Sequence, residues 1–271
     1  MVKGLLLTGG RSQRMGEPKH LLAHQGVTFK ERALQNLAEV CDEVYVSLPH
    51  GAEQVSESEL PDLLPNQGPL GGLATAFAHS PECHWLVLAC DLPNVTVEDL
   101  RRLVENRQDT KDVVCYLNPY DGVPEGHCTL YAPAVKGELD QMLSSDSRCL
   151  RSFLESLVRQ DLTADRSNIL NNLNYPEDFE EWKAQQEGEV SEKQVTVEYY
   201  AKLRQEAGCA SEVVTTTAVT LAGLWEECRM RHRLSTKLPQ MKPAVNNAFT
   251  PLNQPFNDGD LIAFMPPFVG G

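Results

Sequence analysis

The chain has 271 residues, which is enough for one large domain or for two ordinary domains with a core each. Hydrophobic residues make up 41% and charged residues 23%, as in ordinary soluble globular proteins. The formal net charge of −14 lies in the first 193 residues, because residues 194–271 carry seven basic and seven acidic side chains. An acidic N-terminal part is a poor match for duplex nucleic acid, although it can bind a nucleotide where cations gather at one site.

The sequence also predicts a cytoplasmic protein that neither spans nor binds a membrane. No apolar run approaches the length of a membrane-spanning helix, and the apolar start of the chain is too short for a signal peptide. The eight cysteines include no C-x-x-C pair, so we expect reduced and mostly buried thiols rather than disulfides or zinc ligands. Among the seven histidines only His20 and His24 are spaced as H-x-x-x-H, and we expect no structural metal.

The N-terminal part alternates strands and helices. In chain order we expect a strand at 3–8, a helix at 29–40, a strand at 43–48, a helix at 70–79, a strand at 84–90, a helix at 97–106 capped by Thr96, strands at 112–117 and 127–131, and helices at 134–143, 148–158 and 177–185. Repeated β-α-β units with continuous apolar strands predict an α/β fold with a doubly wound, mostly parallel sheet. In such sheets ligands bind at the carboxyl ends of the strands.

The composition changes near residue 185, where a polar and acidic segment without aromatic residues begins. We therefore predict a first domain at 1–185, a linker at 186–193 and a second domain at 194–271. The second domain is expected to contain a strand at 195–200, a helix at 221–231, strands at 243–248 and 261–264, and a turn at 257–260. This order indicates a small α+β domain of the β-grasp, or ubiquitin-like, type.

A glycine-rich loop follows the first strand directly. Leu7 and Thr8 lead into Gly9 and Gly10, and Gly16 stands a few residues later. Phosphate binding needs backbone N–H groups that can approach closely, and glycines remove the side chains that would block them. The cations Arg11, Arg14 and Lys19 stand in the same loop, which is neither a Walker A loop nor a G-x-G-x-x-G loop. The pattern favours phosphate binding over a tight turn with solvated arginines.

Asp91 is the first candidate for a catalytic and metal-binding residue. It follows an apolar strand at the edge where ligands collect, and Pro93 cannot continue the strand ladder. A carboxylate in this place can hold Mg²⁺, which prefers oxygen ligands and bridges phosphate oxygens. The alternative is an aspartate that only forms a turn or caps a helix.

Four motifs in this order carry a resemblance to a known family. The loop reads L-x-G-G-x-S-x-R-M-G-x-x-K from Leu7 to Lys19, and it is followed by Gly68-Pro-Leu-Gly-Gly72, Cys90-Asp-Leu-Pro93 and Asn172-Leu-Asn-Tyr-Pro176. This part of the chain, to about residue 185, resembles the molybdenum cofactor nucleotidyltransferases, and among them the guanylyltransferase (MobA) most closely. The segment from Val123 to His127 departs from the P-L pairing that this family leads us to expect.

The resemblance implies that the domain transfers GMP from GTP to molybdopterin with the help of Mg²⁺. Asp91 would hold the metal, while Arg14, Lys19 and the loop at Leu7, Thr8, Gly9 and Gly10 would bind the phosphates. Asp62, six residues before Gly68, would suit the N–H donors of guanine. Asn172 and Asn174 would bind the pterin, although Asn174 with Glu177 also fits a pair that caps the following helix.

The chain ends in Pro266-Pro267-Phe268-Val269-Gly270-Gly271, directly after an apolar strand. The two prolines stiffen the tail, and the glycines leave a strip thin enough to enter a narrow active site. This ending, together with Leu203-Arg204 and Ala244-Val-Asn246, resembles the sulfur-carrying small subunit of molybdopterin synthase (MoaD). The resemblance implies that an E1-like enzyme activates Gly271, and that the resulting thiocarboxylate serves the large synthase subunit. The alternative is a disordered glycine end.

Two other functions remain open for the first domain. It could be a cytidylyltransferase of the same superfamily, or an inactive scaffold for the sulfur carrier. Gly9-Gly10 and Gly68-Pro-Leu favour guanine without settling the base, and the presence of Asp91 and Lys19 argues against a scaffold.

Overall fold

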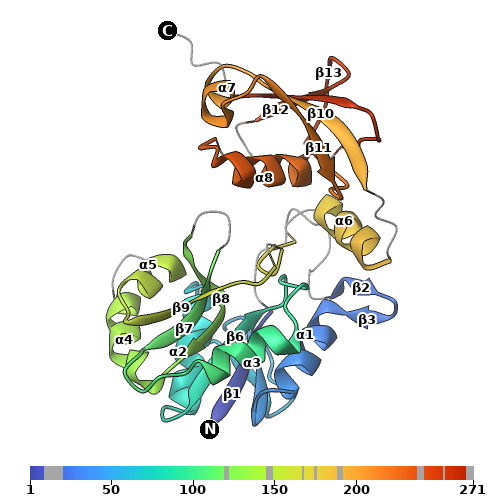
Figure 1. Ribbon diagram of the computed structural model, residues 1–271. Helices are drawn as coiled ribbons and strands as arrows, with labels where there is room; N and C mark the ends of the chain where they lie inside the picture. The colour runs from blue at the N-terminus through green and yellow to red at the C-terminus, as the bar shows by residue number, and fades with distance from the viewer. Residues whose placement is uncertain are drawn as a thin grey trace. The chain divides into compact units, whose positions relative to one another are not determined.

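The computed structural model describes residues 1–8, 21–118, 122–144, 149–166, 168–173, 176–187, 192–236, 241–252 and 254–266. The chain forms two compact units, Met1–Tyr175 and Pro176–Gly271 (Figure 1). The predicted domain limits at 185 and 194 stay predictions. All eight cysteines are free thiols. Within the described residues no helix is both long and apolar enough to cross a bilayer.

The first unit is built on a seven-stranded sheet with the order β5-β4-β1-β6-β8-β7-β9. Adjacent strands run parallel except at β8, which is antiparallel to both β6 and β7. The strands are β1 (Val2–Leu7), β4 (Glu43–Leu48), β5 (Glu59–Pro61), β6 (His84–Ala89), β7 (Val113–Leu117), β8 (Pro124–Tyr131) and β9 (Arg159–Thr163). The predicted doubly wound, mostly parallel sheet is confirmed. A separate two-stranded ribbon pairs β2 (Ala23–His24) with β3 (Val27–Thr28).

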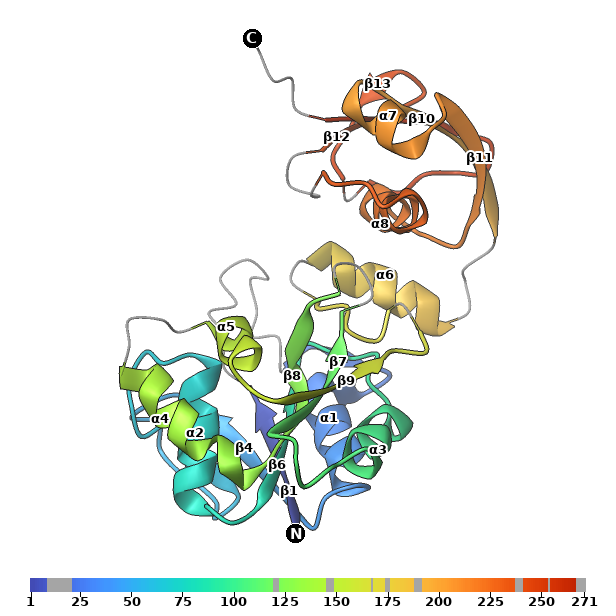
Figure 2. The same ribbon diagram turned by 60° about the vertical axis from the view of Figure 1, so that its left-hand side comes forward.

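Helices cover both faces of this sheet (Figure 2). On one face lie α1 (Phe29–Ala38) and α3 (Val97–Glu105), and on the other lie α2 (Pro69–His79), α4 (Lys136–Ser144) and α5 (Leu150–Glu155), with the short 3-10 helix η2 (Pro133–Val135) before α4. Along β6, Leu86 and Leu88 pack in the first core, while Trp85 and Val87 pack in the second. Because both faces are buried, the strand reads as a continuous apolar run.

Sequence and structure differ mainly at the far edge of the sheet. The predicted helix at 148–158 is wrong in its length, because α5 ends at Glu155 and residues 159–163 form the edge strand β9. Only Leu162 is buried in β9, so the sequence of β9 lacks the apolar pattern from which a strand is predicted. The strand predicted at 127–131 begins earlier, at Pro124. The predicted cap of α3 is confirmed: Thr96 and Asp99 form a capping box.

The second unit begins with α6 (Pro176–Glu187) and continues into a five-stranded sheet with the order β11-β10-β14-β12-β13. Its elements are β10 (Lys193–Tyr199), α7 (Lys202–Ala207), β11 (Ser211–Thr216), α8 (Leu221–His232), β12 (Lys242–Val245), β13 (Ala248–Phe249) and β14 (Leu261–Met265). The first strand, β10, and the last, β14, lie side by side and parallel in the middle of the sheet, and α8 packs its apolar side on them. Trp225 of α8 meets the ring of Phe264 edge-on at 4.9 Å. This is the predicted β-grasp arrangement, with β11 and α7 as elements that the sequence did not predict.

A partly buried carboxylate links two strands and the helix of the β-grasp unit. Glu212 on β11 accepts hydrogen bonds from the Tyr199 hydroxyl and from His232 Nε2, each at 2.6 Å, and Arg231 lies 3.3 Å away. Burial by itself would raise the pKa of Glu212, but the hydrogen bonds from Tyr199 and His232 and the nearby positive charges lower it overall. The ionised carboxylate is therefore favoured in the folded state.

Replacement of Glu212 by glutamine is expected to destabilise the β-grasp unit at neutral pH. A folded-state pKa below the unfolded value of about 4.3 means that the stabilisation is present above that pH and is lost as the pH falls further. The difference between wild type and Glu212→Gln should therefore shrink below about pH 4.3. Hydrogen exchange of β10 and β11 peptides measures this difference in stability. Glu198→Gln is the control, because Glu198 on β10 accepts a hydrogen bond from the hydroxyl of the exposed Tyr200. An equal effect at both positions would contradict the stabilising role of the Glu212 carboxylate.

Candidate functional site

The carboxyl ends of four parallel strands meet at one edge of the first sheet. Thr8 follows β1, Asp62 follows β5, and Asp91 follows β6 by two residues. β5, β4, β1 and β6 are consecutive neighbours in the sheet, so these three side chains belong to the same edge. Leu7, the last residue of β1, is buried in the core, and its carbonyl accepts the Cys90 amide at 3.1 Å. Four predicted site residues therefore lie on adjacent strand ends.

A chain of hydrogen bonds connects Thr8 to Asp62 across β4. The Thr8 hydroxyl donates to the Ser47 carbonyl at 2.8 Å, and the Ser47 hydroxyl donates to Asp62 Oδ1 at 3.1 Å. On the outer side, His50 Nδ1 donates to the Asp62 carbonyl at 2.8 Å. Burial raises the pKa of the half-buried Asp62 carboxyl, and the bond from Ser47 offsets part of this rise. Asp62 is thus held in one place as a hydrogen-bond acceptor at the strand edge.

The glycines of the second motif let α2 approach this edge closely. Gly68 has φ +57° as the residue that precedes the helix, a conformation that glycine adopts without strain. A Cβ on Gly71 would lie 3.0 Å from Asp62 Oδ2, and a Cβ on Gly72 would lie 2.6 Å from Ser47 Oγ. The glycines of the motif therefore allow the first turn of α2 to pack against Ser47 and Asp62.

Substitution of Gly72 by alanine is expected to destabilise the first unit by about 1–3 kcal/mol, because the added methyl group forces Ser47 or the helix to move. Denaturant unfolding of the full chain measures this. Gly137→Ala in α4 is the matched control, since nothing lies within 4 Å of its added Cβ. Alanine is the better helix former, so the control should be neutral or slightly stabilising. A similar loss at both positions would contradict the close approach of α2.

The segment that carries Asn172 is bonded to the segment that carries Asp91. The Leu173 amide donates to the Asp91 carbonyl at 3.1 Å, and Asn94 Nδ2 donates to the Asn168 carbonyl at 3.0 Å. Asn172, next to Leu173, has an exposed side chain. Two motifs that are about 80 residues apart in the sequence thus meet at the carboxyl end of β6.

The remaining predicted site residues, Gly9, Gly10, Arg14, Lys19, Asn174 and Gly271, lie outside the described residues. Their roles stay predictions. In the described part of the β-grasp unit, the central strand β14 ends at Met265 and leads to Pro266. The chain therefore runs from the middle of that sheet towards its C-terminal residues.

A carboxylate and an imidazole at the start of β8 were not predicted as site residues. Because β8 runs antiparallel to β6, its first residues lie at the edge that Asp91 occupies. The strand bulges relative to β7 after Pro124, and Glu125 Oε1 accepts both the backbone N–H and Nδ1 of His127 at 2.8 Å. Burial would raise the pKa of Glu125, but the bonds and charge of His127 lower it overall. In the sequence, the sign of a possible site here is that β8 contains two ionisable residues.

The side chains at this edge suit a magnesium ion that is bound partly by the protein and partly by a substrate. The described residues contain no group of three or more His, Cys, Asp or Glu side chains that could hold a metal alone. Mg²⁺ commonly takes one or two protein carboxylates and completes its shell with water and phosphate oxygens. Asp91 meets that requirement as a single carboxylate at the strand end.

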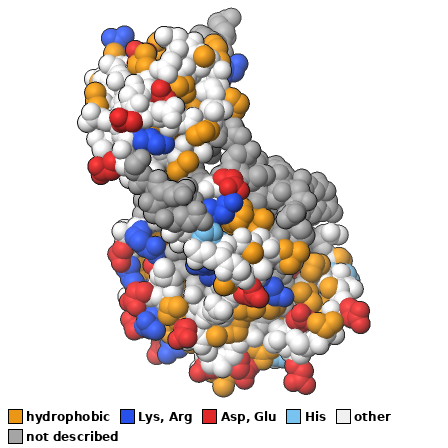
Figure 3. Space-filling view, turned by 90° about the vertical axis from the view of Figure 1, so that its right-hand side faces the viewer, with side chains coloured by type: hydrophobic (Ala, Val, Ile, Leu, Met, Phe, Trp, Pro, Cys, Tyr) orange, Lys and Arg blue, Asp and Glu red, His pale blue; other side chains and the backbone are white. Residues whose placement is uncertain are grey.

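Charged side chains of both signs lie on the surface of the described residues. On the face in Figure 3, Lys and Arg side chains of the described residues are interspersed with Asp and Glu, and they do not gather into one broad basic surface.

Solved structures share the fold of the first unit. The first unit resembles the crystal structure of molybdopterin-guanine dinucleotide biosynthesis protein A from Archaeoglobus fulgidus, with a TM-score of 0.57 over 69% of this chain and 99% of that one. The two are 22% identical, so this likeness establishes the fold alone. The fold is that of the nucleotidyltransferases.

Comparison of sequences gives the family. A family model described as the MobA-like NTP transferase domain matches residues 4–162, and the ThiS family matches residues 197–271. A probable molybdenum cofactor guanylyltransferase from Rhodopirellula baltica is 34% identical over 65% of this chain and 89% of its own length. The chain belongs to the MobA-like NTP transferase family and carries a ThiS-family domain at its C-terminal end, which confirms the predicted fusion.

A bifunctional molybdenum cofactor biosynthesis protein from Synechocystis is 31% identical over 180 residues. The match covers 65% of this chain and 52% of that protein, so the chain spans about half of its length.

Proposed function

We propose that this chain acts at two steps of molybdenum cofactor biosynthesis. The first domain transfers GMP from GTP to molybdopterin: the terminal phosphate of molybdopterin attacks the α-phosphorus, a new P–O–P bond forms, and pyrophosphate leaves. The second domain carries sulfur as a thiocarboxylate on Gly271. The observation that carries the proposal is the meeting of Thr8, Asp62 and Asp91 at one sheet edge, with the Asn172 segment bonded to the Asp91 segment.

Nucleotidyl transfer of this kind depends on positioning and on neutralising charge. Asp91 would hold Mg²⁺, which when bound supplies positive charge to the phosphate oxygens. Leu7 and Thr8 place the glycine loop at the end of β1, so that the amides of Gly9 and Gly10 can bind phosphate oxygens. Arg14 and Lys19 would stabilise the negative charge on the phosphates, including the leaving pyrophosphate.

Asp62 would select the base. Its carboxylate is fixed by Ser47 and lies against the first turn of α2. Guanine presents two N–H donors side by side, at N1 and at the 2-amino group, and one carboxylate can accept both. Cytosine offers a single amino donor beside a ring nitrogen that accepts, so it leaves half of the carboxylate without a donor. On the acceptor side, Asn172 and Asn174 would bind the pterin.

The second domain would work through partners that recognise its tail. An E1-like enzyme would adenylate the Gly271 carboxylate with ATP, and a sulfur donor would displace AMP to leave the thiocarboxylate. The tail would then enter the large subunit of molybdopterin synthase and donate sulfur to the pterin precursor. Its origin from the central strand β14 supports this role, because the tail starts from a rigid part of the fold.

One assay tests the first step. The purified full chain is incubated with GTP, molybdopterin and Mg²⁺, and pyrophosphate and the dinucleotide product are followed. We expect both products only when all three components are present. Pyrophosphate formation without molybdopterin, or no product with the complete mixture, would contradict the proposal. For the second step, mass spectrometry should detect exchange of one oxygen for sulfur at the C-terminus after incubation with an E1-like enzyme, ATP and a sulfur donor.

A further inference from the structure

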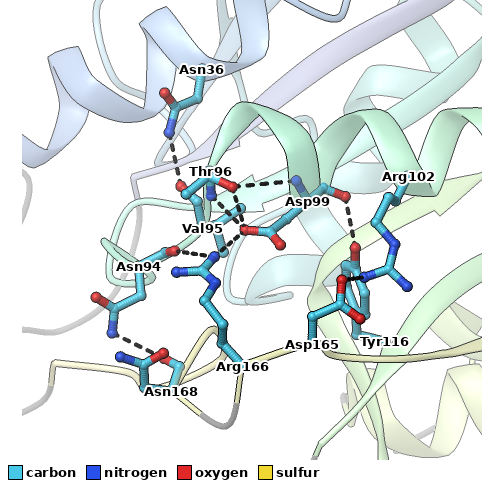
Figure 4. Close-up of polar contacts among 10 residues, drawn as sticks. All are labelled: Asn36, Asn94, Val95, Thr96, Asp99, Arg102, Tyr116, Asp165, Arg166 and Asn168. Carbon is cyan, nitrogen blue, oxygen red and sulfur yellow. Dashed lines mark hydrogen bonds and ion pairs between the residues drawn. The ribbon is translucent and has the colours of Figure 1, made fainter.

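Two loop segments at the site edge are fastened together by three hydrogen bonds. Residues 91–95 follow β6, and residues 165–173 follow β9. Arg166 Nη2 donates to the Asn94 carbonyl at 3.2 Å, and Asn94 Nδ2 donates in return to the Asn168 carbonyl at 3.0 Å (Figure 4). The third bond joins the Leu173 amide to the Asp91 carbonyl at 3.1 Å. The segment that carries Asn172 is therefore fixed to the loop that carries Asp91 at several points.

The loop itself is anchored by helices on either side. Asn36 of α1 donates to the Val95 carbonyl at 2.9 Å. At the start of α3 the Thr96 amide and hydroxyl both donate to Asp99 Oδ2, at 2.8 and 2.6 Å. The side chain of Asp99 is 8% exposed, so its charge lies inside the fold.

Arg166 connects this anchored loop to the later segment. The same Nη2 nitrogen that reaches the Asn94 carbonyl lies 2.5 Å from Asp99 Oδ2. A single guanidinium nitrogen thus contacts a buried carboxylate and a backbone carbonyl together. In Figure 4 the Arg166 side chain rises from the later segment and ends between Asn94 and Asp99.

We propose that Arg166 is a positioning residue, which fixes the Asn172 segment against the Asp91 loop and so sets where the acceptor binds relative to the nucleotide. The inference rests on the proposed function. Arg166 acts through the two segments and is not itself assigned a contact with a substrate. Misplacement of reacting groups by about 1 Å can cost up to about a hundredfold in rate, so such a link has a measurable effect.

Arg102 of α3 provides a matched control that contacts the same segment. It forms an ion pair of 2.5 Å with Asp165, the neighbour of Arg166, and it also donates to the Thr163 carbonyl. It joins α3 to the segment through residues 163 and 165, without a bond to the Asp91 loop among its contacts in the described part of the chain. Loss of either arginine removes one positive charge and one ion pair from this region.

The experiment compares Arg166→Ala, Arg166→Lys and Arg102→Ala in the full chain. For each, kcat and the KM values for GTP and for molybdopterin are measured with Mg²⁺, together with the thermal midpoint. We expect Arg166→Ala to raise the KM for molybdopterin about tenfold and to leave the KM for GTP within about twofold, because Thr8 and Asp62 lie on other strands. Arg166→Lys should fall between wild type and Arg166→Ala, and Arg102→Ala should change neither KM by more than about twofold.

The outcomes separate this inference from the function on which it rests. If the wild type is active and Arg166→Ala has the same kinetic constants as Arg102→Ala, the positioning role alone is overturned. The same holds if Arg166→Ala raises both KM values equally. A wild type that transfers no GMP overturns the proposed function and this inference with it. Should Arg166→Ala fail to fold, Arg166→Lys decides by the same split: a rise in KM for molybdopterin alone supports the role, and unchanged values overturn it.

Discussion

Replacement of Asp91 by alanine is expected to lower kcat for GMP transfer by about a thousandfold, equivalent to ~4 kcal/mol of transition-state stabilisation. Asp91 stands at the carboxyl end of β6 as the proposed ligand of Mg²⁺, and the described residues hold no cluster of three metal-binding side chains that could take its place. The bond from Leu173 is kept in this variant, because it uses the backbone carbonyl of Asp91 and not its carboxylate.

The measurement is steady-state turnover at saturating Mg²⁺, with the thermal midpoint as a check of folding. Asp140→Ala is the matched control, since Asp140 is an exposed carboxylate that pairs with Lys136 along the surface of α4. Its activity should equal that of the wild type. Unchanged turnover of Asp91→Ala would show that the site has been assigned to the wrong carboxylate.

Deletion of Gly271 is expected to abolish sulfur loading and to leave GMP transfer unchanged. Removal of one extended residue draws the terminal carboxylate back by roughly 3.5 Å, which takes it out of line with an activating enzyme. Nucleotidyl transfer should not change, because the two functions belong to separate compact units.

The two variants serve as controls for each other. Asp91→Ala should load sulfur normally and transfer no GMP at a useful rate, whereas the Gly271 deletion should do the reverse. Sulfur loading is followed by mass spectrometry of the intact chain and GMP transfer by pyrophosphate release. Loss of both activities in either variant would contradict the independence of the two functions.

Much of the first fold follows from patterns that are local in the sequence. Most residues of β1 and β6 are apolar because helices cover both faces of the sheet, and the capping pair Thr96 and Asp99 marks the start of α3. β5 and β9 escaped prediction for a physical reason: they are edge strands with one buried residue each, so neither apolar continuity nor alternation marks them.

Part of the candidate site could likewise be predicted from the sequence, and part could not. Asp91 could be predicted because a carboxylate directly after a buried strand of a parallel sheet lies where ligands bind. The partners of Asp62 could not, since Ser47 reaches it from a strand 15 residues away through a pairing that only the fold creates. The bonds from Arg166 to Asn94 and Asp99 join residues that are 72 and 67 positions apart. No local pattern in the sequence indicates such contacts. The Glu125–His127 contact forms beside a bulge near the start of β8, and the sequence does not mark that bulge.

Competition between GTP and CTP tests the central claim most directly. The full chain is given both nucleotides at equal concentration with Mg²⁺ and molybdopterin, and the two dinucleotide products are separated and quantified. The account predicts a preference for GTP of more than about a hundredfold, equivalent to ~2.7 kcal/mol of discrimination. A preference for CTP would contradict the guanylyltransferase assignment while keeping the site, and no turnover of either nucleotide would leave the first domain as a scaffold for the sulfur carrier.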